Sequence, residues 1–199
     1  MNNLEKAKIY GGFGTIIALI GTFVPYIDII LMLIGMILVL LATKFISNDS
    51  GNKKIFENCI ISLIFFVIML ALINLMGFMF FNNLYSLVDS DSYISFSENL
   101  SESTIIDMST KLVIIWIVLW IFLIIIAYFL RKSFIEIYNY TKVDLFKITG
   151  LMYLIGGIST ILIIGTLIWL IAAILQIVAF FSLPKEIKKQ NFEERWNLQ

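Results

Sequence analysis

The sequence predicts an all-α membrane protein with six transmembrane helices in a single membrane domain, residues 1–199. Hydrophobic residues make up 60% of the chain and charged residues 14%, whereas a soluble domain has roughly 45–50% apolar and about 25% charged residues. Apolar runs of about 18 residues or more recur, and several such runs are stable together only in lipid. They lack the alternation of barrel strands, so each is predicted to be a helix that satisfies its own backbone polar groups.

The first apolar stretch is too long for one span and is predicted to form a helical hairpin. Its two spans are expected at about 9–24 and 29–46. Pro25 lacks a backbone N–H and disfavours helix at the residue before it, which predicts a turn at this point. Asp28 is then expected to cap the second helix through its carboxylate. A cation site at the mouth of the hairpin is the alternative interpretation of Asp28.

Small residues crowd this hairpin and predict a close approach of its two helices. Residues without bulky side chains let two helix backbones come into contact within a membrane. These residues are Gly11, Gly12, Gly14, Ala18 and Gly21 in the first helix and Gly35 in the second.

Four further spans are expected at about 58–81, 112–130, 145–164 and 166–183. The Ser-rich, acidic segment 82–110 between the third and fourth spans is predicted to be the longest loop, and 184–199 to be a polar tail. Asp144 is expected to cap the fifth helix, and Gly165 with Thr166 to form the last turn.

The segment Ser133–Tyr140 follows the fourth span and places apolar side chains at helical spacing. Phe134, Ile137 and Tyr138 recur three or four residues apart beside Arg131 and Lys132. This pattern is typical of a helix that lies in the membrane interface. The segment is therefore predicted to anchor the chain at the inner face of the membrane.

The distribution of charge predicts the orientation of the six spans. Six crossings place both termini, the loop 47–57 and the segment 131–144 on one side, and of the 14 Lys and Arg residues only Lys111 falls on the other. Basic residues prefer the cytoplasmic side. The chain is expected in the cell membrane with both termini cytoplasmic and the loop 82–110 external. Asn99 in this loop begins an Asn-Leu-Ser sequon, a candidate glycosylation site that also arises by chance.

The first and last hairpins resemble each other and predict a parallel internal repeat. KIYGGFGTIIALIG at 8–21 aligns with KITGLMYLIGGIST at 147–160, and LLATKFIS at 40–47 aligns with IVAFFSLP at 177–184. Both hairpins begin on the cytoplasmic side of the predicted topology, so the repeats would be related about an axis near the membrane normal. Chance alignment of apolar residues in two membrane hairpins is the alternative.

The sequence also resembles an archaeal family of small integral membrane proteins catalogued as a domain of unknown function. The resemblance rests on VPYIDIILMLIGMILVLLATKFIS at 24–47, AYFLRKSF at 127–134, TGLMYLIGG at 149–157 and AFFSLP at 179–184. It covers nearly the whole chain apart from the external loop and the tail. It implies a membrane location and an archaeal origin, and it brings no activity and no catalytic residues.

The sequence offers few groups for chemistry. It has no histidine, and Cys59 is the only cysteine, which excludes disulfides within the chain, Cys and His zinc clusters and catalysis by histidine. No ionisable residue lies in the middle of a predicted span, where pumps and transporters usually carry one. The protein is therefore expected not to be an enzyme and to have no catalytic, cofactor-binding or metal site. Its net charge of zero indicates no nucleic-acid partner.

Asn74 and Gln176 are the polar residues within predicted spans that cost most to bury in lipid. Each is expected to form a hydrogen bond with a neighbouring helix, which would stabilise the bundle by roughly 0.6–2 kcal/mol. A polar path for a solute would use the same two side chains, and this is the alternative interpretation.

Two functions remain open on these observations. The first is a non-enzymatic membrane protein that acts by helix packing and by contacts with lipid or a partner, either a second copy of the chain or another membrane protein. The alternative is a small transporter or channel for an uncharged or weakly polar solute, with Asn74 and Gln176 facing a shared cavity.

The predicted orientation can be tested by cysteine labelling in intact cells. Cys59 is first replaced, and single cysteines are introduced in place of Ser95 or Ser50. An impermeant thiol reagent added outside is expected to label the first position and to miss the second, because only the first lies in the predicted external loop. Labelling at both positions without cell lysis would contradict the topology.

Overall fold

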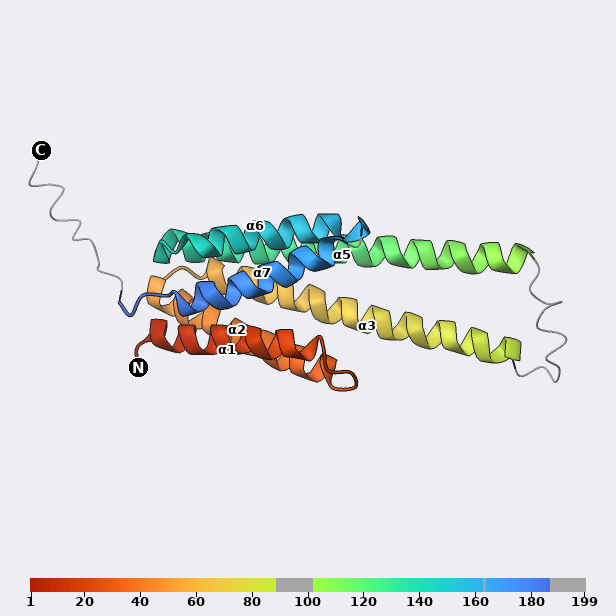
Figure 1. Ribbon diagram of the computed structural model, residues 1–199, viewed down its shortest axis with the longest axis horizontal. Helices are drawn as coiled ribbons and strands as arrows, with labels where there is room; N and C mark the ends of the chain where they lie inside the picture. The colour runs from red at the N-terminus through yellow and green to blue at the C-terminus, as the bar shows by residue number, and fades with distance from the viewer. Residues whose placement is uncertain (89–101, 163, 187–199) are drawn as a thin grey trace, which may run out of the picture.

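The computed structural model describes residues 1–88, 102–162 and 164–186, and the regular structure in these ranges is helical (Figure 1). The helices are α1 (Asn3–Gly21), α2 (Asp28–Ser50), α3 (Lys54–Val88), α5 (Glu102–Thr141), α6 (Asp144–Ser159), the short 3-10 helix η1 (Thr160–Leu162) and α7 (Ile164–Phe181). The prediction of an all-α protein is therefore confirmed.

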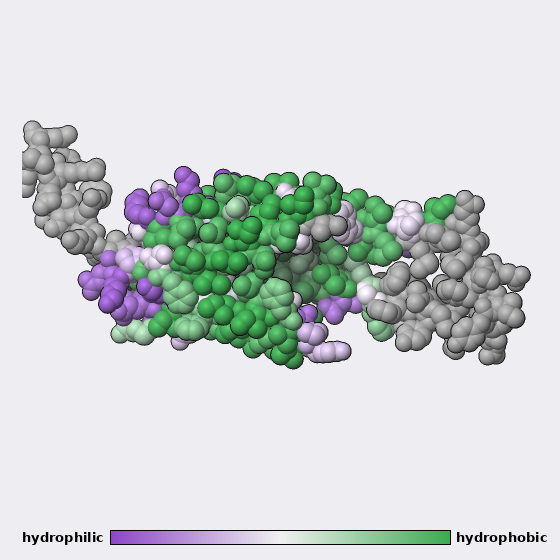
Figure 2. Space-filling view, in the orientation of Figure 1, coloured by the Kyte–Doolittle hydropathy of each residue, from purple (hydrophilic) through white to green (hydrophobic). Residues whose placement is uncertain are grey.

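Length and composition suit these helices to a membrane. Five stretches in the described ranges are long and apolar enough to cross one: Asp28–Ser50, Lys54–Phe78, Ser109–Thr141, Asp144–Leu162 and Ile164–Phe181. Large apolar side chains cover the outside of the bundle (Figure 2), with Ile30 58% and Leu167 63% exposed. Apolar surface of this extent is stable against lipid rather than water. The chain is thus a multi-pass membrane protein. The helix α1 is not one of these five stretches; it has three charged residues near its start and packs along α2.

The long helices of the described chain form a closed ring. Each helix packs on the next in the order α1, α2, α3, α5, α6 and α7, and α7 packs back on α1. The side-chain nitrogen of Asn2 donates a hydrogen bond of 2.6 Å to the carbonyl oxygen of Lys185. The start of α1 and the end of α7 therefore meet at one end of the bundle, which we call the packed end.

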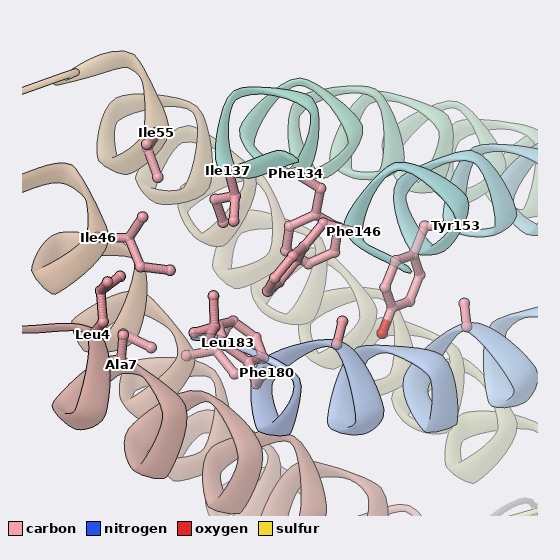
Figure 3. Packing of buried hydrophobic residues seen from close by; sticks show 14 of the residues in the cluster. Leu4, Ala7, Ile46, Ile55, Phe134, Ile137, Phe146, Tyr153, Phe180 and Leu183 are labelled. Carbon is pink, nitrogen blue, oxygen red and sulfur yellow. The ribbon is translucent and has the colours of Figure 1, made fainter. Parts of the chain in front are cut away.

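Aromatic and branched side chains fill the packed end (Figure 3). Phe134, Phe146 and Phe180 are fully buried, and the rings of Phe146 and Phe180 meet edge to face with 5.2 Å between their centroids. The Ser133 hydroxyl donates a 2.7 Å hydrogen bond to the carbonyl oxygen of Ile55, which joins α5 to α3. These contacts close the interior of the ring at this end.

The packed end also carries most of the described basic residues. Figure 2 shows hydrophilic residues gathered there, and lysine ammonium groups lie over aromatic rings at 4.6 Å for Lys132 and Tyr128 and 5.6 Å for Lys147 and Tyr138. Lysines that cover apolar rings while keeping their charge near water are typical of a membrane boundary. That this boundary is the cytoplasmic one stays a prediction.

The helices α1 and α2 cross at their glycines, as predicted. A Cβ atom added to Gly14 would lie 2.7 Å from the Leu38 Cβ and 2.8 Å from the Gly35 carbonyl oxygen. A Cβ atom at Gly35 would meet backbone atoms of Gly14 and Ala18. Backbone atoms cannot turn away as a flexible side chain can, so this crossing requires glycine.

The prediction of a loop over the whole of 82–110 is wrong at both of its ends. The helix α3 continues to Val88, and α5 already begins at Glu102. With 35 and 40 residues, they are roughly 50 and 60 Å long at 1.5 Å per residue. They therefore extend past the other helices (Figure 1). Composition alone did not reveal this, since polar residues lengthen an established helix at little cost.

The prediction that Ser133–Tyr140 lies along the membrane interface is also wrong. The helix α5 runs without a break to Thr141, and the side chains of Phe134 and Ile137 are 0% exposed. Their apolar face packs in the main core cluster with residues of the neighbouring helices, including Phe146. Burial in the bundle gives this face the same removal from water that lipid would give.

Asp28 and Asp144 do not cap their helices. The N-cap positions of α2 and α6 are occupied by Ile27 and Val143, and no side chain caps either helix. The two aspartates are the first helical residues instead. A carboxylate there still interacts favourably with the positive end of the helix dipole, which accounts for aspartate at both helix starts.

The last turn of the bundle lies earlier than predicted. The chain turns through η1, and Gly165 belongs to α7 rather than to the turn. A Cβ atom at Gly165 would collide with backbone atoms of Gly156 and Thr160. This glycine therefore allows the close approach of α6 and α7.

Both terminal hairpins start at the packed end (Figure 1), as a parallel repeat requires. The repeat itself stays a prediction.

The close crossing of α1 and α2 predicts that replacing glycine by alanine changes the thermal stability in opposite directions at Gly35 and at Gly77. Alanine in place of glycine usually favours a helix by about 1 kcal/mol. Gly35→Ala is nevertheless expected to lower the thermal stability of the purified protein, because the new methyl group meets backbone atoms of α1. Gly77→Ala in α3 is the matched control, since an added Cβ there meets nothing within 4 Å. Equal stability of the two variants would contradict the crossing.

Candidate functional site

A cavity of about 450 Å³ lies inside the ring of helices. Side chains from every long helix line it, so it exists only because α7 closes the ring against α1. A volume of this size lies within the range of about 300–1,000 Å³ that small-molecule sites occupy.

The walls of the cavity are mainly apolar. They are formed by Ala18, Leu19, Met32, Met36, Val39, Leu63, Phe66, Ile126, Leu130, Trp169, Leu170 and Ala173. The lining residues that the structure describes include no Asp, Glu, Lys or Arg. The interior therefore offers no opposite charge to an ion that enters it.

A chain of three polar side chains forms the floor of the cavity. The Tyr153 hydroxyl of α6 donates a 2.7 Å hydrogen bond to the Gln176 amide oxygen of α7. The Gln176 amide nitrogen donates a 2.9 Å bond to the Thr15 hydroxyl of α1, which in turn donates a 2.7 Å bond to the Gly11 carbonyl oxygen. All three side chains are buried. We call Thr15, Tyr153 and Gln176 the polar floor.

Local sequence explains why the polar floor forms where it does. Gly11 lies one turn below Thr15, and a Cβ atom there would overlap the ring of Phe180, one turn beyond Gln176. The absence of a side chain at Gly11 thus lets α7 lie against α1, which brings Gln176 within reach of Thr15. Figure 3 shows Tyr153 directed toward α7 from α6. Below the floor, the aromatic side chains of the packed end close the interior.

The cavity extends from this floor toward the opposite end of the bundle. Thr22, which follows α1, and Thr166, in the first turn of α7, also line it. Seven residues separate Thr15 from Thr22, and ten separate Thr166 from Gln176. At 1.5 Å per residue, the cavity extends roughly 10–15 Å along the bundle axis. It is therefore a pocket closed at the packed end rather than a continuous pore.

The two predicted polar residues have different environments. Gln176 bonds to α1 and α6, as predicted for a polar side chain that joins neighbouring helices. The Asn74 side chain is exposed, and its amide donates a 2.8 Å bond to the Leu70 carbonyl oxygen of its own helix. Asn74 is not among the residues that line the cavity, so the structure does not bring the pair together. Asn99 lies outside the described residues.

Sequence reasoning missed Thr15 and Tyr153, although each leaves a signal. Thr15 follows the glycines of GGFGT, and Tyr153 stands within GLMYLIGG. A hydroxyl-bearing side chain on the small-residue face of a membrane helix lies where a neighbouring helix approaches closely. Cys59, whose side chain is 4% exposed, also lines the cavity.

Comparison with known proteins gives a family without a described activity. A family model described as a protein of unknown function (DUF996) matches residues 31–174, from α2 into α7. An uncharacterized protein of Methanocaldococcus jannaschii is 34% identical over 189 residues, which cover 94% of this chain and 97% of that protein. No solved structure matches the chain.

The polar floor predicts that the two amide residues differ in their contribution to stability. Gln176→Leu removes two hydrogen bonds between helices and is expected to cost about 1–2 kcal/mol in the free energy of unfolding. Asn74→Leu, the matched control, removes one exposed bond within a helix and is expected to change it by less than about 0.5 kcal/mol. Reversible unfolding in mixed micelles measures both. A larger effect for the Asn74 variant would contradict this account of the floor.

Proposed function

This chain belongs to the DUF996 family of proteins of unknown function, and we propose that it is a non-enzymatic membrane protein that binds an uncharged, largely apolar solute. The observation that carries this proposal is the cavity of about 450 Å³ with apolar walls and a polar floor. A solute that fills a space of this size gains van der Waals contacts with its apolar walls, and packed protein interiors contain few spaces larger than a water molecule.

The chemistry of the lining supports an uncharged solute. An ion transferred from water into a site without a charged partner pays a large desolvation cost. The polar groups that line the cavity belong to Gln176, Tyr153, Ser62, Cys59, Trp169 and the threonines Thr15, Thr22 and Thr166. The Trp169 indole N–H is buried and has no hydrogen-bond partner in the described structure. These groups are suited to hydrogen bonding with a neutral molecule.

The same lining supports a binding role rather than catalysis. Nucleophilic catalysis pairs a hydroxyl or thiol with a base, and acid–base catalysis uses a carboxylate, imidazole or amine. The hydroxyls of Thr15 and Tyr153 are instead held by an amide and a backbone carbonyl. We therefore assign the cavity to binding.

The closed packed end supports a carrier rather than an open channel, if the solute crosses the membrane. Phe134, Phe146 and Phe180 fill the interior below the polar floor, so passage would require this end to open. The basic residues at the packed end support a cytoplasmic position for it. In this orientation the cavity opens toward the outer half of the membrane.

A second candidate function is contact with a partner or with lipid through helix packing. It is favoured by the parts of α3 and α5 that extend past the other helices, where Phe78 is 66% and Val113 57% exposed. A second copy of the chain or another membrane protein would cover these side chains.

The native Cys59 gives a direct test of the cavity. N-ethylmaleimide is small, neutral and membrane-permeant. At mildly alkaline pH, where a larger fraction of the thiol is ionised, it is expected to react with Cys59 in the folded protein, because this side chain lines the cavity. Ala173→Trp places an indole in the same space and is expected to slow the reaction strongly. Mass spectrometry of the intact protein over time measures the labelling rate.

Ile174→Trp is the matched control for this experiment. Ile174 is the next residue along α7 and is 49% exposed on the outside of the bundle, so its variant should be labelled at the wild-type rate. Equal rates for all three proteins would refute a solute-accessible cavity and would favour the second candidate function.

A further inference from the structure

We propose that the solute carries one neutral group that both donates and accepts a hydrogen bond, a hydroxyl or a primary amide, and places it against Gln176. This inference rests on the proposed function and deepens it, because it names the chemical class of the solute. It follows from the hydrogen-bonding capacity of the polar floor and from the character of the walls around it.

Gln176 is 5% exposed and keeps unused capacity on both sides of its amide. A glutamine amide has two N–H donors and two acceptor lone pairs. The bonds to Thr15 and Tyr153 use one donor and one lone pair. A second N–H and a second lone pair therefore remain on a buried group, and a buried polar group without a partner is costly. A ligand that supplies both an acceptor and a donor would satisfy the two together.

The other members of the polar floor strengthen this requirement. The Thr15 and Tyr153 hydroxyls each donate to a fixed acceptor, Gly11 and Gln176 respectively. The Ser62 hydroxyl, which also lines the cavity, donates to the Ile126 carbonyl oxygen at 3.2 Å. Each of these oxygens can still accept. The floor therefore offers one donor among several acceptors, so a ligand that only accepts, such as an ether or a carboxylate, would leave these acceptors without a partner. The indole N–H of Trp169, which also lines the cavity, is a further buried donor without a partner in the described structure.

A cation would find acceptors at the floor but no compensating charge. The lining residues that the structure describes include neither carboxylates nor basic side chains. Desolvation would therefore exclude ammonium and carboxylate head groups alike.

The walls around the floor suit a flat or flexible apolar body. Met32 and Met36 from α2 face the cavity together with Phe66, Tyr153 and Trp169. Methionine side chains adapt to irregular shapes and contact aromatic rings favourably. An aromatic probe with a single polar substituent matches this combination of walls and floor.

Five naphthalene probes with the same ring and different head groups test the inference. They are 2-naphthalenemethanol, 2-naphthamide, 2-ethylnaphthalene, 2-naphthoate and 2-naphthylmethylammonium, and the readout is protection of Cys59 from N-ethylmaleimide in the wild-type protein in nanodiscs. The alcohol and the amide are expected to protect at concentrations about fivefold lower than the ethyl compound, the ratio that one net hydrogen bond of about 1 kcal/mol gives. The anion and the cation are expected to protect weakly or not at all.

The outcomes separate this inference from the proposed function. Equal protection by the alcohol, the amide and the ethyl compound would overturn the head-group assignment while leaving the cavity as an apolar binding site. Best protection by the anion or the cation would overturn both. Protection by none of the neutral probes, with Cys59 still labelled, would also overturn the head-group assignment.

Gln176→Leu checks the residue responsible. The variant is expected to lose the fivefold preference for the alcohol while 2-ethylnaphthalene still protects Cys59, which also shows that the cavity remains folded. Asn74→Leu should keep the wild-type preference, because Asn74 lies away from the cavity. If the Gln176 variant keeps the preference for the alcohol over 2-ethylnaphthalene, the assignment of the head group to Gln176 is overturned. The comparison among probes on the wild-type protein does not depend on any variant.

Discussion

The contact of α1 with α7 is the constraint on which the bundle depends. Helices that follow each other in the described part of the chain pack on each other, and this contact joins the first of them to the last. It is possible because Gly11 leaves room for the ring of Phe180, while Gly14 on the same helix admits α2. In lipid no hydrophobic effect drives helices together, so such close packing and the hydrogen bonds it permits must hold the ring. The cavity and its polar floor are consequences of that closure.

The two ends of the ring differ because their side chains differ. At the packed end, large aromatic residues such as Phe146 and Phe180 interdigitate with glycines and alanines. Toward the other end the lining changes to methionine, leucine and threonine, and the side chains no longer fill the space between helices. The polar floor lies at the boundary between these two regions. Its members hydrogen-bond to one another across three helices, as buried polar groups in a membrane interior must where partners are within reach.

Much of the fold follows from the sequence, because length, hydropathy and glycine placement act locally. The hairpin turn at Pro25 and the close crossing of α1 and α2 were predictable in this way. The partners of Gln176 were not, since Thr15 lies 161 residues away in sequence and meets it only after the ring closes. The exposed position of Asn74 was not predictable either. Apolar residues cover every face of its helix near this position, so hydrophobic periodicity does not reveal which side of the helix faces lipid. The helical ends of α3 and α5 are not evident from the sequence, because their polar composition is equally typical of a loop.

The length of α5 has a mechanical consequence. It is one unbroken helix from Glu102, beyond the rest of the bundle, to Thr141 at the packed end, and it carries Phe134 and Ile137 into the core there. Helices without proline or an inserted residue bend only gently, so α5 behaves as a stiff rod. A tilt imposed on its outer end is therefore transmitted along the rod to the aromatic side chains that close the interior. A single element of secondary structure thus joins the part of the chain that extends past the bundle to the aromatic core at the packed end.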